Sequence, residues 1–338
     1  MKPSLTPQQS TRRTLLGASL LLPLASWADS SAFKPSRPIK ITVPQTPGTT
    51  PDMLARLLAP KLQGALDTPF IVENKTGASG LIGMDYVAKA SPDGYTLLSN
   101  VSTTLTLPFF YKDLPFKVLD DFTPIGLIGS GNFVLTVHQD LPAKDVSELV
   151  ALLKQSPGKY NYASPGLGTH HHLCMELFQS QTGTQLVHIP YKGSAGATTD
   201  HVGGQIPIMF LPAQVAISQA ASGRIRILGG TRKSRHPSFP DIPSLHEQGL
   251  EGYDVDPWYA LWAPPSLPAQ IQRSLNQVLN AQLQDAGIQQ ELLKQGIIAR
   301  PDSPEALKQV AQNEYALWNR LFTDLNIGAP KTAAPGAS

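Results

Sequence analysis

The sequence is poor in cysteine and in charge. Its 338 residues include a single cysteine, Cys174, so no internal disulfide can form, and this residue lies too far from the N-terminus to carry a lipid anchor. Only 15% of the residues are charged, with 27 Lys and Arg against 25 Asp and Glu. A nearly neutral chain without basic clusters is not expected to bind nucleic acid.

Sequence signatures of catalysis are also missing. Gly77-Ala78-Ser79-Gly80 does not match the Gly-x-Ser-x-Gly turn of hydrolases, and no His-Glu-x-x-His occurs. The adjacent carboxylates of Asp120 and Asp121 point apart, which does not suit general acid–base catalysis. Cys174 lies in an apolar helical stretch, which predicts a buried thiol rather than a nucleophile. We therefore expect no catalytic residues and no cofactor.

The N-terminus has the pattern of an export signal. Arg12-Arg13 precedes the apolar residues 15–24, and Ser26-Trp27-Ala28 supplies the small residues that a signal peptidase recognises. The apolar run is shorter than the roughly 20 residues that span a bilayer. Residues 1–28 are therefore predicted to be a twin-arginine or general secretory signal, and the mature chain a soluble, unanchored periplasmic protein. A chance basic start on a cytosolic protein is the alternative.

The rest of the chain alternates strand and helix patterns. Residues 39–43 alternate apolar and polar like a half-covered strand, and Thr50-Pro51-Asp52 then starts a helix. Similar units recur up to about residue 230. This alternation, with 41% hydrophobic residues, predicts an α/β fold of two domains, each with a mostly parallel sheet flanked by helices. Residues 328–338 lack an apolar pattern and are predicted to be disordered.

Two loops that join a strand to a helix are candidate binding sites, Pro44 to Asp52 and Ser164 to Thr169. Their glycines let the backbone approach a ligand, and free N–H groups at a helix N-terminus bind carboxylate or phosphate. In α/β folds such loops lie at the carboxyl ends of strands, where ligands bind. Each loop by itself is more often an ordinary tight turn, and neither matches the P-loop or the dinucleotide fingerprint.

The run His170-His171-His172 leaves three interpretations open: a metal site, structural or solvent-facing histidines, and contact with an organic ligand. On a helix, His170 shares a face with Cys174 and His172 with Glu176. Each pair offers two ligands, whereas zinc sites usually have three or four, so no metal is predicted. A nearby helix N-terminus favours the neutral imidazole.

Six segments, in order, resemble those of the Bug, or TctC-like, periplasmic solute-binding proteins of tripartite tricarboxylate transporters. The resemblance extends over about residues 33–327. The segments are PIKITVP (38–44), VENKTGASG (72–80), SPDGYTLL (91–98), PGKYNYASPGLGT (157–169), HIPYKG (188–193) and FPDIP (239–243).

This resemblance implies a type II-like clamshell with the ligand in the cleft between two domains. The first domain would comprise residues 29–131 and 258–327, and the second residues 132–257. Family members hold a carboxylate mainly through loop N–H groups, hydroxyls and water. The ligand-binding residues that the resemblance and the loops imply here are Gln45, Thr46, Pro47, Gly48, Thr49, Thr50, Ser102, Ser164, Gly166, Gly168, Thr169, His170, His171 and Phe210.

The expected function is capture of a small organic mono- or dicarboxylate by hinge closure, and its delivery, by a monomeric receptor, to the membrane subunits of a tripartite transporter. Leu211-Pro212 stands where many members carry Asp, which makes amino-acid ligands less expected. Thr169-His170-His171-His172 replaces the more usual small or amide residues, which favours a bulkier or aromatic carboxylate. The alternatives are an exported metal-binding protein or hydrolase that uses His170 to His172, and a ligand-sensing module for a signalling partner.

Overall fold

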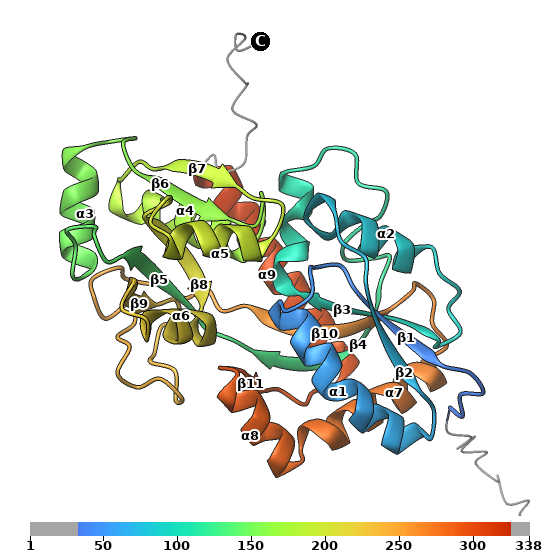
Figure 1. Cartoon of the computed structure of the whole chain (residues 1–338). Helices are drawn as coiled ribbons and strands as arrows, with labels where there is room; N and C mark the ends of the chain where they lie inside the picture. The colour runs from blue at the N-terminus through green and yellow to red at the C-terminus, as the bar shows by residue number, and fades with distance from the viewer. Residues whose placement is uncertain (1–32, 326–338) are drawn as a thin grey trace, which may run out of the picture. The chain divides into compact units, whose positions relative to one another are not determined.

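Two sheets organise residues 33–325, the part of the chain that the computed structural model describes (Figure 1). The first sheet has six strands in the order β11-β4-β10-β3-β1-β2, and the second has five in the order β7-β6-β8-β5-β9. We call each sheet with its helices a lobe. The predicted signal peptide and the predicted disordered tail lie outside the described residues.

The first lobe is built from two separate parts of the chain. Its strands are β1 (Ile39–Val43), β2 (Phe70–Asn74), β3 (Thr96–Val101), β4 (Thr123–Ser130), β10 (Trp258–Ala263) and β11 (Ile298–Ala299). Its helices are α1 (Thr50–Leu66), α2 (Leu81–Ala88), α7 (Ala269–Leu283) and α8 (Ala286–Lys294), with the 3-10 helices η1 (Ala78–Gly80) and η2 (Ser102–Phe109).

The second lobe is formed by the middle of the chain. Its strands are β5 (Phe133–His138), β6 (Asn161–Ser164), β7 (Val187–Pro190), β8 (Ile208–Pro212) and β9 (Ile225–Gly230). Its helices are α3 (Val146–Gln155), α4 (His170–Thr182), α5 (Ser194–Val202) and α6 (Ala213–Ala220).

Both sheets are mixed: most strands of each run in one direction, as predicted, but antiparallel pairings also occur, among them that of β11 with β4. In the first lobe β1 pairs in parallel with β2 and β3, and in the second β6 pairs in parallel with β7 and β8. One strand in each sheet lies antiparallel between two others: β10 between β3 and β4, and β5 between β8 and β9. Both of these strands come directly after the chain has crossed from the other lobe.

The two crossovers lie side by side. Gly131 and Asn132 join β4 to β5, and residues 231–257 join β9 to β10. The Gly131 amide donates a hydrogen bond to the Pro257 carbonyl at 2.8 Å, and the Thr231 amide donates to the Phe133 carbonyl at 2.8 Å. The two points where the chain passes between the lobes are therefore hydrogen-bonded to each other, whereas much of residues 231–257 packs on the second lobe.

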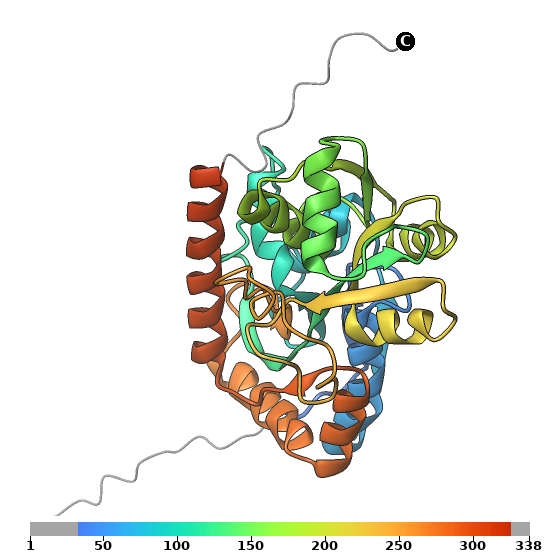
Figure 2. The same cartoon turned by 90° about the vertical axis from the view of Figure 1, so that its left-hand side faces the viewer.

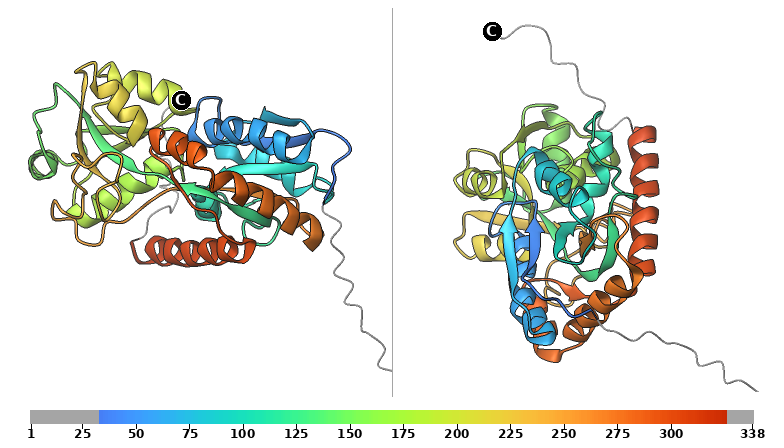
Figure 3. Two further views of the ribbon diagram at one scale, coloured as in Figure 1. Left: turned by 90° about the horizontal axis from the view of Figure 1, so that it is seen from below. Right: turned by 90° about the vertical axis from the view of Figure 1, so that its right-hand side faces the viewer.

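A long C-terminal helix, α9 (Pro304–Leu325), packs against both lobes (Figures 2 and 3). Leu307 and Ala311 belong to an apolar cluster with β10 and β4, whereas Trp318 and Phe322 belong to the cluster around β5 and α4. Burial of these large side chains on two cores stabilises the position of the helix.

Burial corrects one expectation about β1. The alternating pattern predicted a half-covered strand, yet Thr42 is as fully buried as Ile41 and Val43. β1 lies inside the sheet, between β2 and β3, and helices pack on both faces, so all of its residues except Lys40 are buried. Lys40 remains half-exposed and pairs with Glu73 at 2.9 Å.

Candidate functional site

A cavity of about 740 Å³ lies between the two lobes. Its wall is formed by the loops that follow β1, β2, β6, β7 and β8, together with the start of η2. The first turns of α1, α4, α5 and α6 therefore border it. These loops sit at the carboxyl ends of parallel strands, the edge at which α/β proteins bind ligands.

The two loops singled out from the sequence form the same turn on opposite sides of this cavity. In residues 46–49 the Thr49 amide donates to the Thr46 carbonyl at 3.3 Å, and in residues 166–169 the Thr169 amide donates to the Gly166 carbonyl at 3.4 Å. The third residue of each turn is a glycine with positive φ, 81° for Gly48 and 72° for Gly168.

No side chain caps the N-terminus of the helix that follows either loop. The helices begin one residue after a threonine, so the N-cap of α1 is Thr49 and not the predicted Thr50. The Thr49 hydroxyl donates backwards to the Thr46 carbonyl at 2.8 Å, and the Thr169 hydroxyl donates to the Gly166 carbonyl at 2.7 Å. The leading N–H groups of α1 and α4 are thus available to an anion in the cavity.

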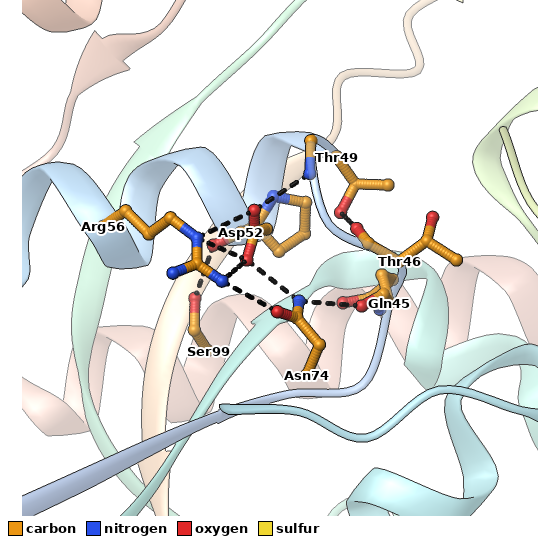
Figure 4. Close-up of polar contacts among 9 residues, drawn as sticks. Gln45, Thr46, Thr49, Asp52, Arg56, Asn74 and Ser99 are labelled. Atoms are coloured by element: carbon orange, nitrogen blue, oxygen red, sulfur yellow. Dashed lines mark hydrogen bonds and ion pairs between the residues drawn. The ribbon is translucent and has the colours of Figure 1, made fainter. Parts of the chain in front are cut away.

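Asp52 supports the first loop from behind (Figure 4). Its buried carboxylate accepts hydrogen bonds from the Gly48 amide at 2.9 Å, from Arg56 Nε at 3.0 Å and from Asn74 Nδ2 at 2.9 Å. Burial alone would raise the pKa of this carboxyl, but the bonds from Arg56, Gly48 and Asn74 outweigh it and lower the pKa. Asn74 also donates to the Gln45 carbonyl, so both ends of the loop are tied down.

Ser164 and His172 support the second loop. The Ser164 hydroxyl lies 2.6 Å from His188 Nε2 and accepts a bond from the Gly166 amide at 3.1 Å. His172 Nδ1 accepts from the Gly168 amide at 3.3 Å, and its ring lies against that of His188 with centroids 4.5 Å apart. These two side chains position the turn and do not line the cavity.

The three consecutive histidines do not converge. His170 Nε2 lies 3.0 Å from the Val255 carbonyl oxygen, His171 packs on Phe133, and His172 lies 3.7 Å from Glu176. Within residues 33–325 no group of three or more His, Cys, Asp and Glu side chains is placed to hold a metal ion. The metal interpretation therefore has no geometric support in the described part of the chain.

Burial makes all three imidazoles neutral. It lowers the pKa of His170 to about 4 and the pKa values of His171 and His172 to about 3. The sequence predicted neutral rings because of the helix N-terminus, but loss of hydration is the main cause. Burial likewise raises the pKa of the Cys174 thiol, in agreement with the predicted unreactive cysteine.

Most of the residues proposed from the sequence border the cavity, and four lie elsewhere. Pro47 is exposed, Ser102 is buried beside Glu314, and Ser164 lies behind its loop. Phe210 points into the core of the second lobe, 6.5 Å from the Tyr253 ring, because alternate residues of a strand face opposite sides. The predicted residues that do line the cavity are Gln45, Thr46, Gly48, Thr49, Thr50, Gly166, Gly168, Thr169, His170 and His171.

Several lining residues were not predicted. Thr76 to Gly80 and Tyr191 to Ser194 follow β2 and β7, so the strand-end argument used for the first two loops could have found them. Leu211 follows Phe210 and faces the cavity in its place. Tyr111 and Tyr259 carry no signal in the sequence, because distant parts of the chain bring them to the site.

The cavity has little charge. Among the described residues that line it, Lys192 is the one lysine or arginine, and none is an aspartate or a glutamate. An ammonium group of a ligand would find no carboxylate there, whereas a carboxylate would find N–H groups and a lysine.

Hydrogen bonds join the lobes at the edge of the cavity. The Ser79 hydroxyl donates to the Leu167 carbonyl at 3.2 Å and lies 2.9 Å from the Tyr111 hydroxyl. The Thr106 hydroxyl donates to the Gly168 carbonyl at 3.1 Å. Ser79 and the preceding Ala78 both have positive φ, 56° and 46°, which is uncommon for residues other than glycine and is typical of functional turns.

The fold and the cavity define a two-lobed α/β solute-binding protein. The family described as "Tripartite tricarboxylate transporter family receptor" (TctC) matches residues 54–327, and the chain belongs to this family. Its members are solute-binding receptors and not enzymes. The relative Protein BugT of Bordetella pertussis (strain Tohama I) is 36% identical over 273 residues, which are 79% of this chain and 84% of BugT.

Two solved structures of R. palustris proteins are similar over nearly the whole described fold. Rpa4515 with adipate has a TM-score of 0.84 and 31% identity, and the alignment covers 87% of this chain and 99% of that one. MatC with bound malate has a TM-score of 0.80 and 27% identity, with 85% and 99% covered. None of the helices in residues 33–325 is long and apolar enough to cross a membrane.

Proposed function

We propose that this protein captures an organic carboxylate in the cavity between its lobes and delivers it to the membrane subunits of a tripartite transporter. One observation carries the proposal: two uncapped helix N-termini from opposite lobes, those of α1 and α4, border one cavity whose lining within residues 33–325 has no acidic side chain. Such N-termini bind anions through free N–H groups and the helix dipole. The adipate and malate found in two similar proteins support the same ligand class.

Capture would proceed by hinge closure. A carboxylate first binds the free N–H groups of one lobe, and the other lobe then completes the hydrogen bonds. The two points where the chain passes between the lobes, at residues 131–132 and 257–258, are the proposed hinge, and they separate residues 29–131 and 258–327 from residues 132–257. Contacts such as Ser79 to Leu167 would hold the closed state, which is the form that the transporter would recognise.

The lining favours a ligand with an apolar or aromatic body. Rings from Tyr111, Phe133, Tyr191 and Tyr259 border the cavity, and Leu211 adds aliphatic surface. These side chains offer hydrophobic contact and ring stacking but no counter-ion for an amino group. A carboxylate with a bulky or aromatic body is therefore the proposed class, in preference to amino acids.

Export to the periplasm completes the proposal. Residues 1–28 have the pattern of a signal peptide, and the family name describes a receptor for a membrane transporter. We further propose that the mature chain acts as a monomer.

Thermal shifts against a panel of aliphatic and aromatic mono- and dicarboxylates test the ligand class. A ligand at about 100 times its dissociation constant raises the free energy of unfolding by about 2.7 kcal/mol. For a chain of this size the melting temperature then rises by several degrees. The shift is expected for at least one carboxylate and is expected to be unchanged by a chelator. Absence of a shift with every acid, together with a fall in melting temperature on adding the chelator, would overturn the proposal in favour of a metal-binding protein.

A further inference from the structure

The turn at residues 77–80 has an unusual run of backbone conformations. All four φ angles are positive: 130° for Gly77, 46° for Ala78, 56° for Ser79 and 98° for Gly80. Glycine adopts such angles readily, whereas alanine and serine are strained because their Cβ comes too close to the following carbonyl oxygen. Within residues 33–325 only four residues other than glycine have positive φ, and two of them stand side by side here. Backbone strain is therefore concentrated in this turn.

The turn lies where the two lobes meet. It follows β2 of the first lobe and borders the cavity. The Ser79 hydroxyl donates to the Leu167 carbonyl of the second lobe at 3.2 Å. A Cβ on Gly166 would lie 3.2 Å from the same hydroxyl oxygen, so the backbone of the second lobe passes close to the turn. If the lobes moved apart, these contacts would be lost and the turn would be free to relax.

The two strained residues differ in what their side chains contribute. Ser79 supplies the hydroxyl that bonds to the second lobe. Ala78 carries an exposed methyl group, which has no polar atom and adds no hydrogen bond between the lobes. A glycine at position 78 would avoid the strain, yet the chain has glycine only on either side of this pair. Strained residues persist where the surrounding structure holds them, and they are typical of ligand clamps and switch regions.

We propose that closure of the lobes imposes the strain on Ala78, and that its relief on opening speeds release of the ligand. The inference rests on the proposed carboxylate-binding function and adds a device that sets how long a ligand stays bound. In a two-state protein the apparent affinity falls with the fraction of the binding-competent form. Strain confined to the closed form lowers that fraction, so it weakens the binding of every ligand by the same factor.

Ala78→Gly tests the proposal, because glycine adopts positive φ without this strain. Calorimetric titration of the wild type and the variant uses malate, adipate, benzoate and phenylacetate. Every acid that binds the wild type is expected to bind Ala78→Gly about 5- to 30-fold more tightly, by a similar factor for each acid. Stopped-flow mixing should assign most of the gain to slower dissociation. Loss of the methyl group cannot cause such a gain, since it removes apolar surface from the cavity.

Ser266→Gly is the matched control. Ser266 is exposed, has a φ of 64° and lies outside the cavity, so relief of its strain should leave the affinity for each acid unchanged. Ala78→Asn is a second variant in case Ala78→Gly does not fold, because asparagine also tolerates positive φ. It should bind the acids more tightly than the wild type, again by a similar factor for each. Circular dichroism establishes that the variants fold.

A measurement without ligand separates this inference from the proposed function. Small-angle scattering should give a smaller radius of gyration for ligand-free Ala78→Gly than for the wild type or Ser266→Gly, because relief of the strain favours the closed form by itself. If no acid binds, the carboxylate function fails and the scattering result alone decides whether the turn opposes closure. If acids bind with equal affinity to the wild type and Ala78→Gly, the carboxylate function stands. The turn is then equally strained in the open and closed forms, and the inference is wrong.

Discussion

At the scale of single residues, the site depends on buried polar groups that hold backbone in position. Asp52 fixes the Gly48 amide, Ser164 fixes the Gly166 amide, and His172 accepts from the Gly168 amide. None of the three lines the cavity. The sequence identified Asp52 only as an acid in the first turn of a helix, and its contact with Asn74 depends on a strand 22 residues further on.

Asp52→Asn tests this support at constant side-chain volume. Both carboxylate oxygens accept hydrogen bonds in the wild type, so an amide NH₂ in either place faces a donor and leaves it unpaired. The expected loss is about 1–3 kcal/mol of stability, together with weaker carboxylate binding because the first loop is released. Thermal melting and calorimetric titration measure both effects. The exposed Asp113→Asn is the control, and equal behaviour of the two variants would contradict the role of Asp52.

Buried neutral histidines predict that stability falls in mild acid. Burial lowers the pKa of His171 to about 3, below its value of about 6.5 in an unfolded chain. Above pH 6.5 the imidazole is neutral in both states and contributes no pH dependence. Between pH 6.5 and about 3 the unfolded chain takes up the proton first, so stability decreases as the pH falls, by up to about 1.4 kcal/mol per pH unit.

A comparison of wild type with His171→Phe isolates this contribution. Asp256, whose pKa burial raises to about 7, acts in the opposite direction and is common to both proteins. Melting curves between pH 6.5 and 5 should show the wild type losing up to about 2 kcal/mol more than the variant. Parallel pH profiles would mean that His171 is already charged, or solvated, in the folded protein.

At the scale of elements, a turn of the same type precedes α1 and α4. Anion binding depends on these two turns, because they leave the first N–H groups of both helices free. Each turn needs a glycine at its third position, and the two glycines differ in their surroundings. A Cβ on Gly168 would lie 2.9 Å from the Phe110 ring, whereas a Cβ on Gly48 would meet nothing within 4 Å. The second turn is therefore packed against the other lobe and the first is open.

Gly168→Ala is expected to lower the free energy of unfolding by more than the conformational strain of an alanine at positive φ. The strain is about 1–2 kcal/mol, and the contact with Phe110 adds to it and displaces the turn that begins α4. Gly158→Ala is a matched control, because Gly158 has nearly the same φ of 70° but open space around it and lies outside the cavity. Calorimetry should find weaker carboxylate binding for Gly168→Ala alone. Similar affinities in both variants would contradict a role of this turn in binding.

The sequence predicted the elements that carry strong local signals and missed those that do not. The strand predicted at residues 39–43 and the helix start predicted at Thr50-Pro51-Asp52 have such signals, and β1 and α1 lie at the expected positions. β4 was missed because Gly126 and Gly129 interrupt its apolar pattern. A Cβ at these positions would meet Asn276 at 2.9 Å and the Ile298 carbonyl at 2.6 Å, so close packing requires glycine where strand propensity would favour larger residues.

At the scale of the whole molecule, the family resemblance predicted the two-lobed fold, but only the folded chain shows which loops share the cavity. Gln45 and Thr169 were found because each lies in a glycine-rich loop. Tyr259 was not, since its strand returns to the first lobe after the chain has passed through the second. Neutral histidines were expected, but burial by Phe133 and the rest of the core is a property of the fold that no local pattern encodes.

The last prediction concerns the contact between lobes at Ser79. Its hydroxyl donates to the Leu167 carbonyl and lies within hydrogen-bond distance of Tyr111, so Ser79→Ala removes the direct bond across the cavity edge. A hydrogen bond of this kind contributes about 0.5–1.5 kcal/mol, which corresponds to a loss of affinity of roughly 2- to 12-fold. If the bond forms only on closure, the loss should appear as faster dissociation with little change in association.

Stopped-flow binding of a carboxylate that shifts the melting temperature measures both rates. Ser222→Ala is the control, because Ser222 is exposed and its hydroxyl bonds to Gln219 within the same lobe. Small-angle scattering should show that ligand compacts the wild type more completely than Ser79→Ala at equal concentrations. Unchanged dissociation in Ser79→Ala would place the closing contacts at the other side-chain bonds between the lobes, such as those from Thr106 to Gly168 and from Gln214 to Thr50. Retention of the ligand would then depend on the packed turn before α4, the element that Gly168→Ala perturbs.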